Sequence, residues 1–277
     1  ECITDANSHH LASCEGYQRS AVWVVRLSGA RDANGAPNYL REIPALLQLA
    51  AACADSDDAF SIYPISTGNN WGYGSALAAN GSAVILDLSK LCDIELDDED
   101  LGLVTIGPGV TQQQLREFLD ARQLPFMVPV TGAGPYCSLL ANALERGYGI
   151  TPYTDHFAAV NALKAFLPSG ERYQSSICEL DKSAQHRIDK TFKWKVGPYL
   201  DGLFTQSGFG VVTEVTLRLK KLPPAFDSFY LQFAEDEDLE QAVLVARDIL
   251  QRLEGVVGSV NIMDRRRVIS MMVPVSS

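Results

Sequence analysis

Three observations predict an α+β fold for this chain of 277 residues. Short, strongly apolar runs that are typical of buried strands recur along the chain. Between them, apolar residues follow helical spacing in a few longer segments. Hydrophobic residues make up 47% and charged residues 21% of the sequence, so the chain can build a real core as one large domain or two modest ones.

Residues 1–20 are polar and aperiodic, and we expect them to be a poorly ordered lead-in. The expected strands are 21–27, 60–65, 83–88, 104–106, 160–167 and 211–219, and the expected helices are 39–54, 111–122 and 138–146. Thr111 and Gln114 have the spacing of an N-terminal capping box. The strand at 211–219 should alternate inward Val and Leu with outward Thr and Arg.

Pro223-Pro224 marks the expected end of the first domain. A strand at 229–233, an acidic turn at 235–238, a helix at 239–253 and a further strand-like stretch then predict a β-α-β module. Residues 225–277 would form the beginning of a second domain. A piece of that size buries little apolar surface by itself.

Composition excludes several classes of protein. A net charge of −11 argues against non-specific nucleic-acid binding, and the basic run 190–195 is too short to reverse this. No apolar run approaches the length of a membrane span, and the given sequence opens without an export signal. The six cysteines are scattered without a metal-ligand rhythm. We therefore expect no metal and unpaired thiols in a reducing compartment, the cytoplasm.

Residues 64–74 form a glycine-rich loop that follows a strand. Gly68, Gly72 and Gly74 would let consecutive backbone N–H groups turn toward phosphate oxygens without interference from Cβ atoms. The loop matches neither a Walker motif nor a GxGxxG turn that opens a helix. On spacing alone, a glycine-rich hairpin is an equal alternative.

A second loop, 131–138, is rich in small residues, especially at 131–135, and leads into the helix expected to begin near Ser138. A helix N-terminus beside small residues is a natural anion site. Because each loop follows a strand and about 60 residues separate them, we expect the two loops to converge on one diphosphate.

Three segments occur in an order known from one family: residues 64–74, residues 142–156 with Asp155-His156 at their end, and residues 197–213. Together they resemble the vanillyl-alcohol oxidase / p-cresol methylhydroxylase flavoproteins, which have a PCMH-type FAD-binding domain. The resemblance covers about residues 39–265. It implies two α+β subdomains that hold FAD in residues 21–222, followed by a cap domain of which only the start, 225–277, is present.

The resemblance also implies which residues bind FAD. The first loop would surround the pyrophosphate mainly through backbone N–H groups, and Val212 would meet the adenine end through its main chain. Taken singly, Ser138 could only cap a helix, Asn142 could satisfy a buried backbone group, and Val212 could be plain core. The implied set is Ile65, Ser66, Thr67, Gly68, Asn69, Asn70, Gly72, Thr131, Gly132, Gly134, Ser138, Asn142, Arg146, Gly147 and Val212.

Asp155-His156 invites interpretation as a general base, since histidine titrates near neutral pH. The corresponding pair in the family looks structural, and we favour a hydrogen-bonded structural pair. Tyr199 and Asp201 also resemble structural positions. No catalytic residue is assigned.

Two departures from the family pattern narrow the expected chemistry. Relatives that attach FAD at two points have a His in the first loop, which this chain lacks, and a Cys that aligns with Val128. We therefore expect non-covalent FAD. Phenol-oxidising relatives place an Asp after a Val-Pro pair, near the reactive nitrogen of the flavin, where this chain has Val130. This departure argues against the oxidation of para-substituted phenols specifically, and not against flavin binding.

The resemblance implies an FAD-dependent oxidoreductase that oxidises a small alcohol or phenol by hydride transfer to flavin N5. The alternative is a non-catalytic or partner-dependent FAD-binding subunit without its own substrate pocket. A homodimer or a partner subunit could complete the cap.

Overall fold

The computed structural model describes residues 2–3, 23–69, 76, 78, 82–149, 155–175 and 188–272. The chain divides into two compact units, Glu1–Leu222 and Pro223–Ser277. In the described part of the chain, no helix is both long and apolar enough to cross a bilayer.

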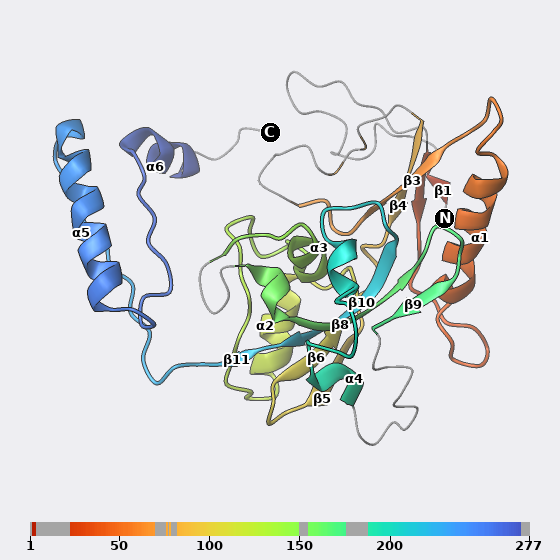
Figure 1. Cartoon of the computed structure of the whole chain (residues 1–277), viewed down its shortest axis with the longest axis horizontal. Coiled ribbons are helices and arrows are strands. Elements are labelled where there is room, and N and C mark those ends of the chain that lie inside the picture. Colours follow the sequence, from red (N-terminus) through yellow and green to blue (C-terminus); the bar gives the residue numbers. More distant parts are fainter. Residues whose placement is uncertain are drawn as a thin grey trace. The chain divides into compact units, whose positions relative to one another are not determined.

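The first sheet of unit 1 has the order β1-β2-β4-β3, formed by Cys2–Ile3, Trp23–Arg26, Ala83–Asp87 and Ser61–Ile65. Strands β2, β4 and β3 run parallel, and β1 pairs antiparallel with β2. Helix α1 (Tyr39–Ala52) lies beside this sheet (Figure 1). It buries Ile43 and Leu47 in a cluster with Leu27 and Leu86.

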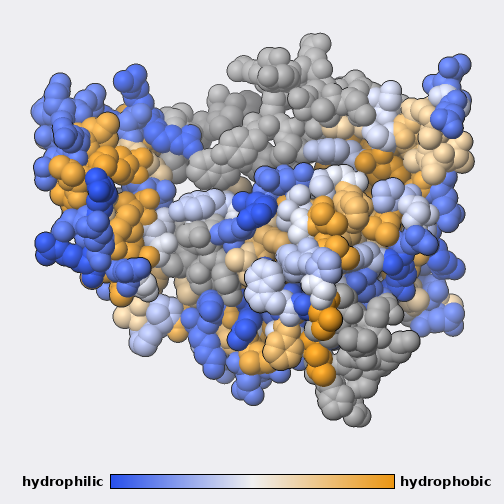
Figure 2. All heavy atoms as spheres, viewed as in Figure 1, coloured by the Kyte–Doolittle hydropathy of each residue, from blue (hydrophilic) through white to orange (hydrophobic). Residues whose placement is uncertain are grey.

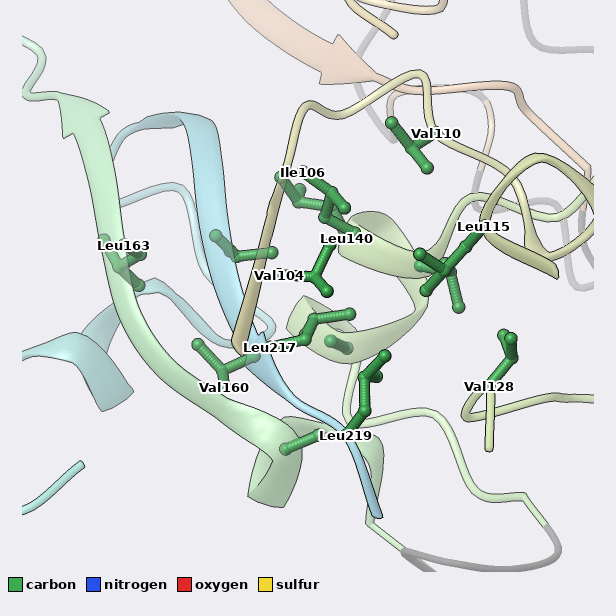
Figure 3. Packing of buried hydrophobic residues seen from close by; sticks show 14 of the residues in the cluster. Val104, Ile106, Val110, Leu115, Val128, Leu140, Val160, Leu163, Leu217 and Leu219 are labelled. Atoms are coloured by element: carbon green, nitrogen blue, oxygen red, sulfur yellow. The ribbon is translucent and has the colours of Figure 1, made fainter. Parts of the chain in front are cut away.

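The second sheet is antiparallel, with the order β5-β6-β10-β8-β9. Its strands are Ile94–Asp98, Leu103–Ile106, Val211–Arg218, Val160–Phe166 and Arg172–Gln174. Helices α2 (Gln112–Asp120) and α3 (Leu139–Leu144) pack on it, and Figure 3 shows Leu115 and Leu140 from these helices in one cluster with strand residues. The expected capping box is confirmed: Gln114 N donates to Thr111 Oγ1 at 3.2 Å, and Thr111 N donates to Gln114 Oε1 at 2.8 Å.

Shorter elements complete unit 1. They are β7 (Phe126–Met127) paired with β11 (Lys220–Lys221), helix α4 (Ile188–Thr191), and the 3₁₀ turns His156–Ala159 and Asp201–Phe204.

The prediction that the threonines of β10 face outward was wrong, because Thr213 and Thr216 are buried. A bulge interrupts the strand between Val212 and Glu214. Thr216 and Thr105 share a hydrogen bond of 2.8 Å, and Thr105 donates to the buried carboxylate of Asp97 at 2.5 Å. Lys190 of α4 also contacts Asp97, at 2.6 Å. Thr213 Oγ1 donates instead to Lys164 O at 3.3 Å. Both buried hydroxyls therefore have hydrogen-bond partners within the sheet, which sequence alternation does not reveal.

Unit 2 differs from the expected β-α-β module. It contains a 3₁₀ turn (Asp236–Asp238), helix α5 (Leu239–Arg252) and helix α6 (Arg265–Met272), and residues 223–272 form no strand. Phe229 and Tyr230, within the expected strand, are 69% and 97% exposed. A strand needs a neighbour for its backbone groups, and these residues have none in the described part of the unit. Apolar side chains also lie on the surface of α5 (orange in Figure 2).

Candidate functional site

The carboxyl ends of the three parallel strands meet at one edge of the first sheet. Ile65 of β3 and Arg26 of β2 both lie opposite Asp87 of β4. Leu88 N donates to Ile65 O at 2.9 Å, so the loop after β3 and the turn after β4 begin side by side. Ligands of parallel sheets bind beyond this edge, where loops can move without disturbing the core.

The turn after β4 supports the loop after β6. Gly107 N donates to Asp93 O at 3.0 Å, and Gly109 N donates to Leu91 O at 2.9 Å. A Cβ at Gly107 would overlap the carbonyl of Leu91, and one at Gly109 would overlap the carbonyl of Ser89. Only glycine permits this close approach, which joins the second sheet to the binding edge of the first.

The two glycine-containing loops of the sequence do come together. Asn69 Nδ2 in the first loop donates to Tyr136 O in the second at 3.2 Å. Ser138 at the end of the second loop donates from Oγ to Pro108 O at 2.6 Å and accepts from Ala141 N at 3.1 Å. Ser138 therefore caps α3 and ties the second loop to the one after β6.

Gln112 is the main residue of this region that the sequence did not indicate. Its side chain is buried and spans the second loop: Oε1 accepts from Thr131 N at 2.6 Å, and Nε2 donates to Thr131 O at 3.2 Å and to Gly134 O at 2.5 Å. In the sequence, Gln112 is one of three consecutive glutamines at a helix start, and nothing local distinguishes it from Gln113.

Several features of these loops fit the pyrophosphate of a dinucleotide. Thr67 Oγ1 is buried and has no hydrogen-bond partner among the described residues. Gly68 and Gly134 have φ of +70° and +97°, and a Cβ at Gly134 would meet no atom within 4 Å. A buried hydroxyl without a partner and an accessible left-handed backbone are what a bound phosphate would require. Asn70 and Gly72 lie outside the described residues.

Helix α3 ends in a left-handed turn that holds three of the expected site residues. Arg146 has φ of +54°, its N–H donates to Ala143 O, and Gly147 N donates to Asn142 O at 2.7 Å. These two bonds form a Schellman motif with arginine where glycine is usual. A Cβ at position 147 would overlap the side chain of Asn142, so only glycine at this position leaves room for the Asn142 amide.

Asp155 and His156 have structural partners, but they do not pair with each other. Asp155 forms an ion pair with Arg146 and accepts from Phe157 N at 3.0 Å. His156 is 1% exposed, its Nδ1 contacts the amide of Asn142, and its Nε2 has no partner among the described residues. Burial lowers the pKa of His156, against a smaller opposing effect of Asp155. A neutral imidazole therefore fixes the Asn142 side chain.

Val212 lies on β10 of the second sheet, and Tyr199 and Asp201 lie before that strand in the chain. Val212 is buried in the main core and lies opposite Ala165 on β8. Asp201 is buried and accepts from Tyr173 Oη at 2.6 Å and Ser175 Oγ at 2.8 Å. Tyr199 packs near Phe157 and Trp194. The contacts of Asp201 and Tyr199 are structural.

Comparisons with known proteins agree with this geometry. A family model described as an FAD binding domain matches residues 41–176. The 1'-carboxy-chondrochloren decarboxylase of Chondromyces crocatus is 32% identical over 236 residues, which cover 85% of this chain and 42% of the relative. The 4-cresol dehydrogenase [hydroxylating] flavoprotein subunit of Pseudomonas putida is 34% identical over 188 residues, or 68% of this chain and 36% of the relative.

Solved structures show the same fold. Substrate-bound p-cresol methylhydroxylase superposes with a TM-score of 0.74 at 26% identity, covering 90% of this chain and 46% of that one. The 4-ethylphenol oxidase from Gulosibacter chungangensis, at 20% identity, superposes with a TM-score of 0.75 over 91% of this chain and 46% of that one. The chain thus spans less than half the length of these relatives.

The fold and its converging loops define a domain that binds FAD. More particularly, the chain belongs to the flavoproteins with a PCMH-type FAD-binding domain, the family of p-cresol methylhydroxylase.

Proposed function

We propose that this chain is the FAD-binding part of an oxidoreductase that oxidises a small organic substrate of the alcohol or phenol type. The observation that carries the proposal is the meeting of the two glycine-containing loops at the carboxyl edge of the parallel strands, joined by Asn69 and Tyr136. The related enzymes include a 4-cresol dehydrogenase, which supports the substrate class. Bound FAD would supply a hydride acceptor at N5, and the protein would orient it and its substrate.

We propose that the first loop binds the pyrophosphate, with Thr67 Oγ1 donating to a phosphate oxygen. Gln112 and Ser138 hold the second loop in place beside it, and His156 orients Asn142 toward the same site. The full proposed set is Ile65, Ser66, Thr67, Gly68, Asn69, Asn70, Gly72, Thr131, Gly132, Gly134, Ser138, Asn142, Arg146, Gly147 and Val212.

The described Cys53, Cys92 and Cys137 are free thiols, which supports the proposed reducing, cytoplasmic compartment.

We propose that FAD is held without a covalent bond, because the first loop lacks histidine and Val128 is a buried aliphatic residue. The purified protein should show flavin absorption, and acid precipitation should release all of it into the supernatant. Yellow colour that stays with the precipitate would contradict non-covalent binding. A colourless protein that takes up no added FAD would contradict the site itself.

The second candidate is a partner-dependent flavoprotein, in which residues 21–222 bind FAD and residues 225–277 begin a cap. It is favoured by the 4-cresol dehydrogenase relative, whose name describes it as a flavoprotein subunit, and by the exposed apolar residues of unit 2. Anaerobic mixing with a panel of alcohols and phenols separates the two. Bleaching of the flavin by the chain alone supports the enzyme, and bleaching only after a partner is added supports the subunit.

A further inference from the structure

A hollow of about 300 Å³ lies in unit 1, on the second sheet. It is bounded by the start of β8, the segment that follows α4, and the end of β10 with β11. Its main lining residues are Asn161, Phe192, Lys193, Trp194, Arg218 and Lys220. No residue of this group belongs to the proposed FAD site.

The charge of the hollow is opposite to that of the chain. Lys193, Arg218 and Lys220 are cationic and none of the described lining residues is acidic, whereas the whole chain carries a net charge of −11. Arg218 and Lys220 are both exposed. Such a site attracts a small anion, while the net negative charge of the chain disfavours nucleic acid and other polyanions.

Lys193 is held in a fixed position at the wall of the hollow. Its ammonium donates to Phe157 O at 2.7 Å and to Ala158 O at 3.2 Å. It also lies 4.9 Å from the centre of the Phe157 ring and 5.9 Å from that of Tyr199. An ammonium has three N–H donors, so one N–H is available to an anion in the hollow.

The hollow also presents aromatic surface. Phe192 and Trp194 are 56% and 73% exposed, although aromatic side chains usually bury most of their area. The Trp194 ring packs against Tyr199 with centroids 5.1 Å apart, which holds the indole in place. The volume is at the lower limit for small-molecule sites and suits a single ring.

We propose that this hollow binds a small aromatic carboxylate, with the carboxylate on Lys193 and the ring against Trp194. The site is separate from the proposed flavin chemistry, and binding there needs no redox step.

Protonation of Lys193 provides an independent test. Burial lowers the pKa of Lys193 to about 8, with a further lowering by Arg146 and opposing effects of Asp155 and Asp201. The cationic Arg218 and Lys220 line the same hollow. A carboxylate prefers the protonated amine, so affinity should fall as the pH rises through about 8.

The experiment is calorimetric titration of the FAD-loaded protein with benzoate, at constant ionic strength. Lys193→Met should weaken binding about tenfold, the equivalent of one charge-assisted hydrogen bond, and should remove the fall in affinity above pH 8. Lys221→Met, an equal change of charge outside the hollow, is the matched control and should leave affinity within about twofold. Trp194→Leu should weaken benzoate but leave inorganic sulfate unaffected.

Four results would overturn the proposal: unchanged benzoate affinity in Lys193→Met, equal weakening in Lys221→Met, equally tight binding of cyclohexanecarboxylate, or a benzoate-induced change of the flavin spectrum that survives in Lys193→Met. The last result would place the ligand at the flavin. If Lys193→Met does not fold, Trp194→Leu and the pH profile of the unmodified protein decide by the same criteria.

Discussion

Replacing Gln112 by Met tests whether one buried side chain orders the second FAD loop. Methionine has a similar volume and keeps the buried position of Gln112 filled, but it removes the three hydrogen bonds to Thr131 and Gly134. Each such bond contributes about 0.5–1.5 kcal/mol of stability, so the ordered conformation of the loop would be destabilised by roughly 2–4 kcal/mol. Because Thr131 and Gly134 are only half-buried, water can replace part of this loss.

When FAD binds to the variant, the second loop must first become ordered. The free energy of this ordering raises the dissociation constant for FAD. A loss of about 2 kcal/mol corresponds to roughly 30-fold weaker binding, and we expect an effect of this size. The assay is titration of the apoprotein with FAD, followed by quenching of flavin fluorescence. Urea unfolding of the apoprotein measures separately how far the fold itself is destabilised.

The neighbouring Gln113→Met is the matched control. Gln113 is exposed, and among the described residues its side chain donates only to Glu117 on the same helix, at 2.7 Å. We expect its FAD affinity to stay within about twofold of the unmodified protein, since an exposed pair of this kind contributes only a few tenths of a kcal/mol. The reasoning is refuted if Gln112→Met binds FAD as tightly as the unmodified protein, or if Gln113→Met weakens FAD equally.

Three further predictions concern the same region. Thr67→Val should weaken FAD binding about tenfold while leaving the apoprotein equally or more stable, because Oγ1 has no partner to lose among the described residues. A less stable apoprotein with normal FAD affinity would contradict this. Gly149→Ala should lower the unfolding free energy by roughly 1–3 kcal/mol, because the new Cβ would overlap His156 and Val130 O. Gly208→Ala has open space around the new Cβ and should change little, so equal urea midpoints of the two variants would refute the packing argument. The unfolded-state pKa of His156 is about 6.5 and the folded-state pKa is lower, so the stabilising contribution of His156 is complete above pH 6.5 and is lost below it. The difference in unfolding free energy between the unmodified protein and His156→Gln should therefore shrink between pH 7.5 and pH 5, and a constant difference would be contrary evidence.

The errors in the sequence-based prediction have a common physical origin. Thr216 was expected to face outward, but it is buried and its hydroxyl pairs with Thr105, which donates to Asp97, the partner of Lys190 in α4. The partners come from positions about a hundred residues away, which no local pattern records. Residues 229–233 have strand-like composition, but strand propensity is realised only beside another strand.

What the sequence determined by itself was local. Hydrophobic periodicity located the principal strands and helices of unit 1 and helix α5, the Thr111–Gln114 box marked the start of α2, and glycine spacing marked both loops. Each of these signals depends on residues close together in the chain.

The tertiary structure decided which loops share a site and which side chains hold them. Gln112 is indistinguishable from its neighbours in sequence, and only packing places its side chain across the second loop, against Thr131 and Gly134. His156 contacts Asn142 instead of Asp155, and Lys193 becomes part of a cationic hollow, because chain segments far apart in sequence meet there. Contacts of this kind follow from the packing of whole sheets and helices, and the residue types alone do not contain them.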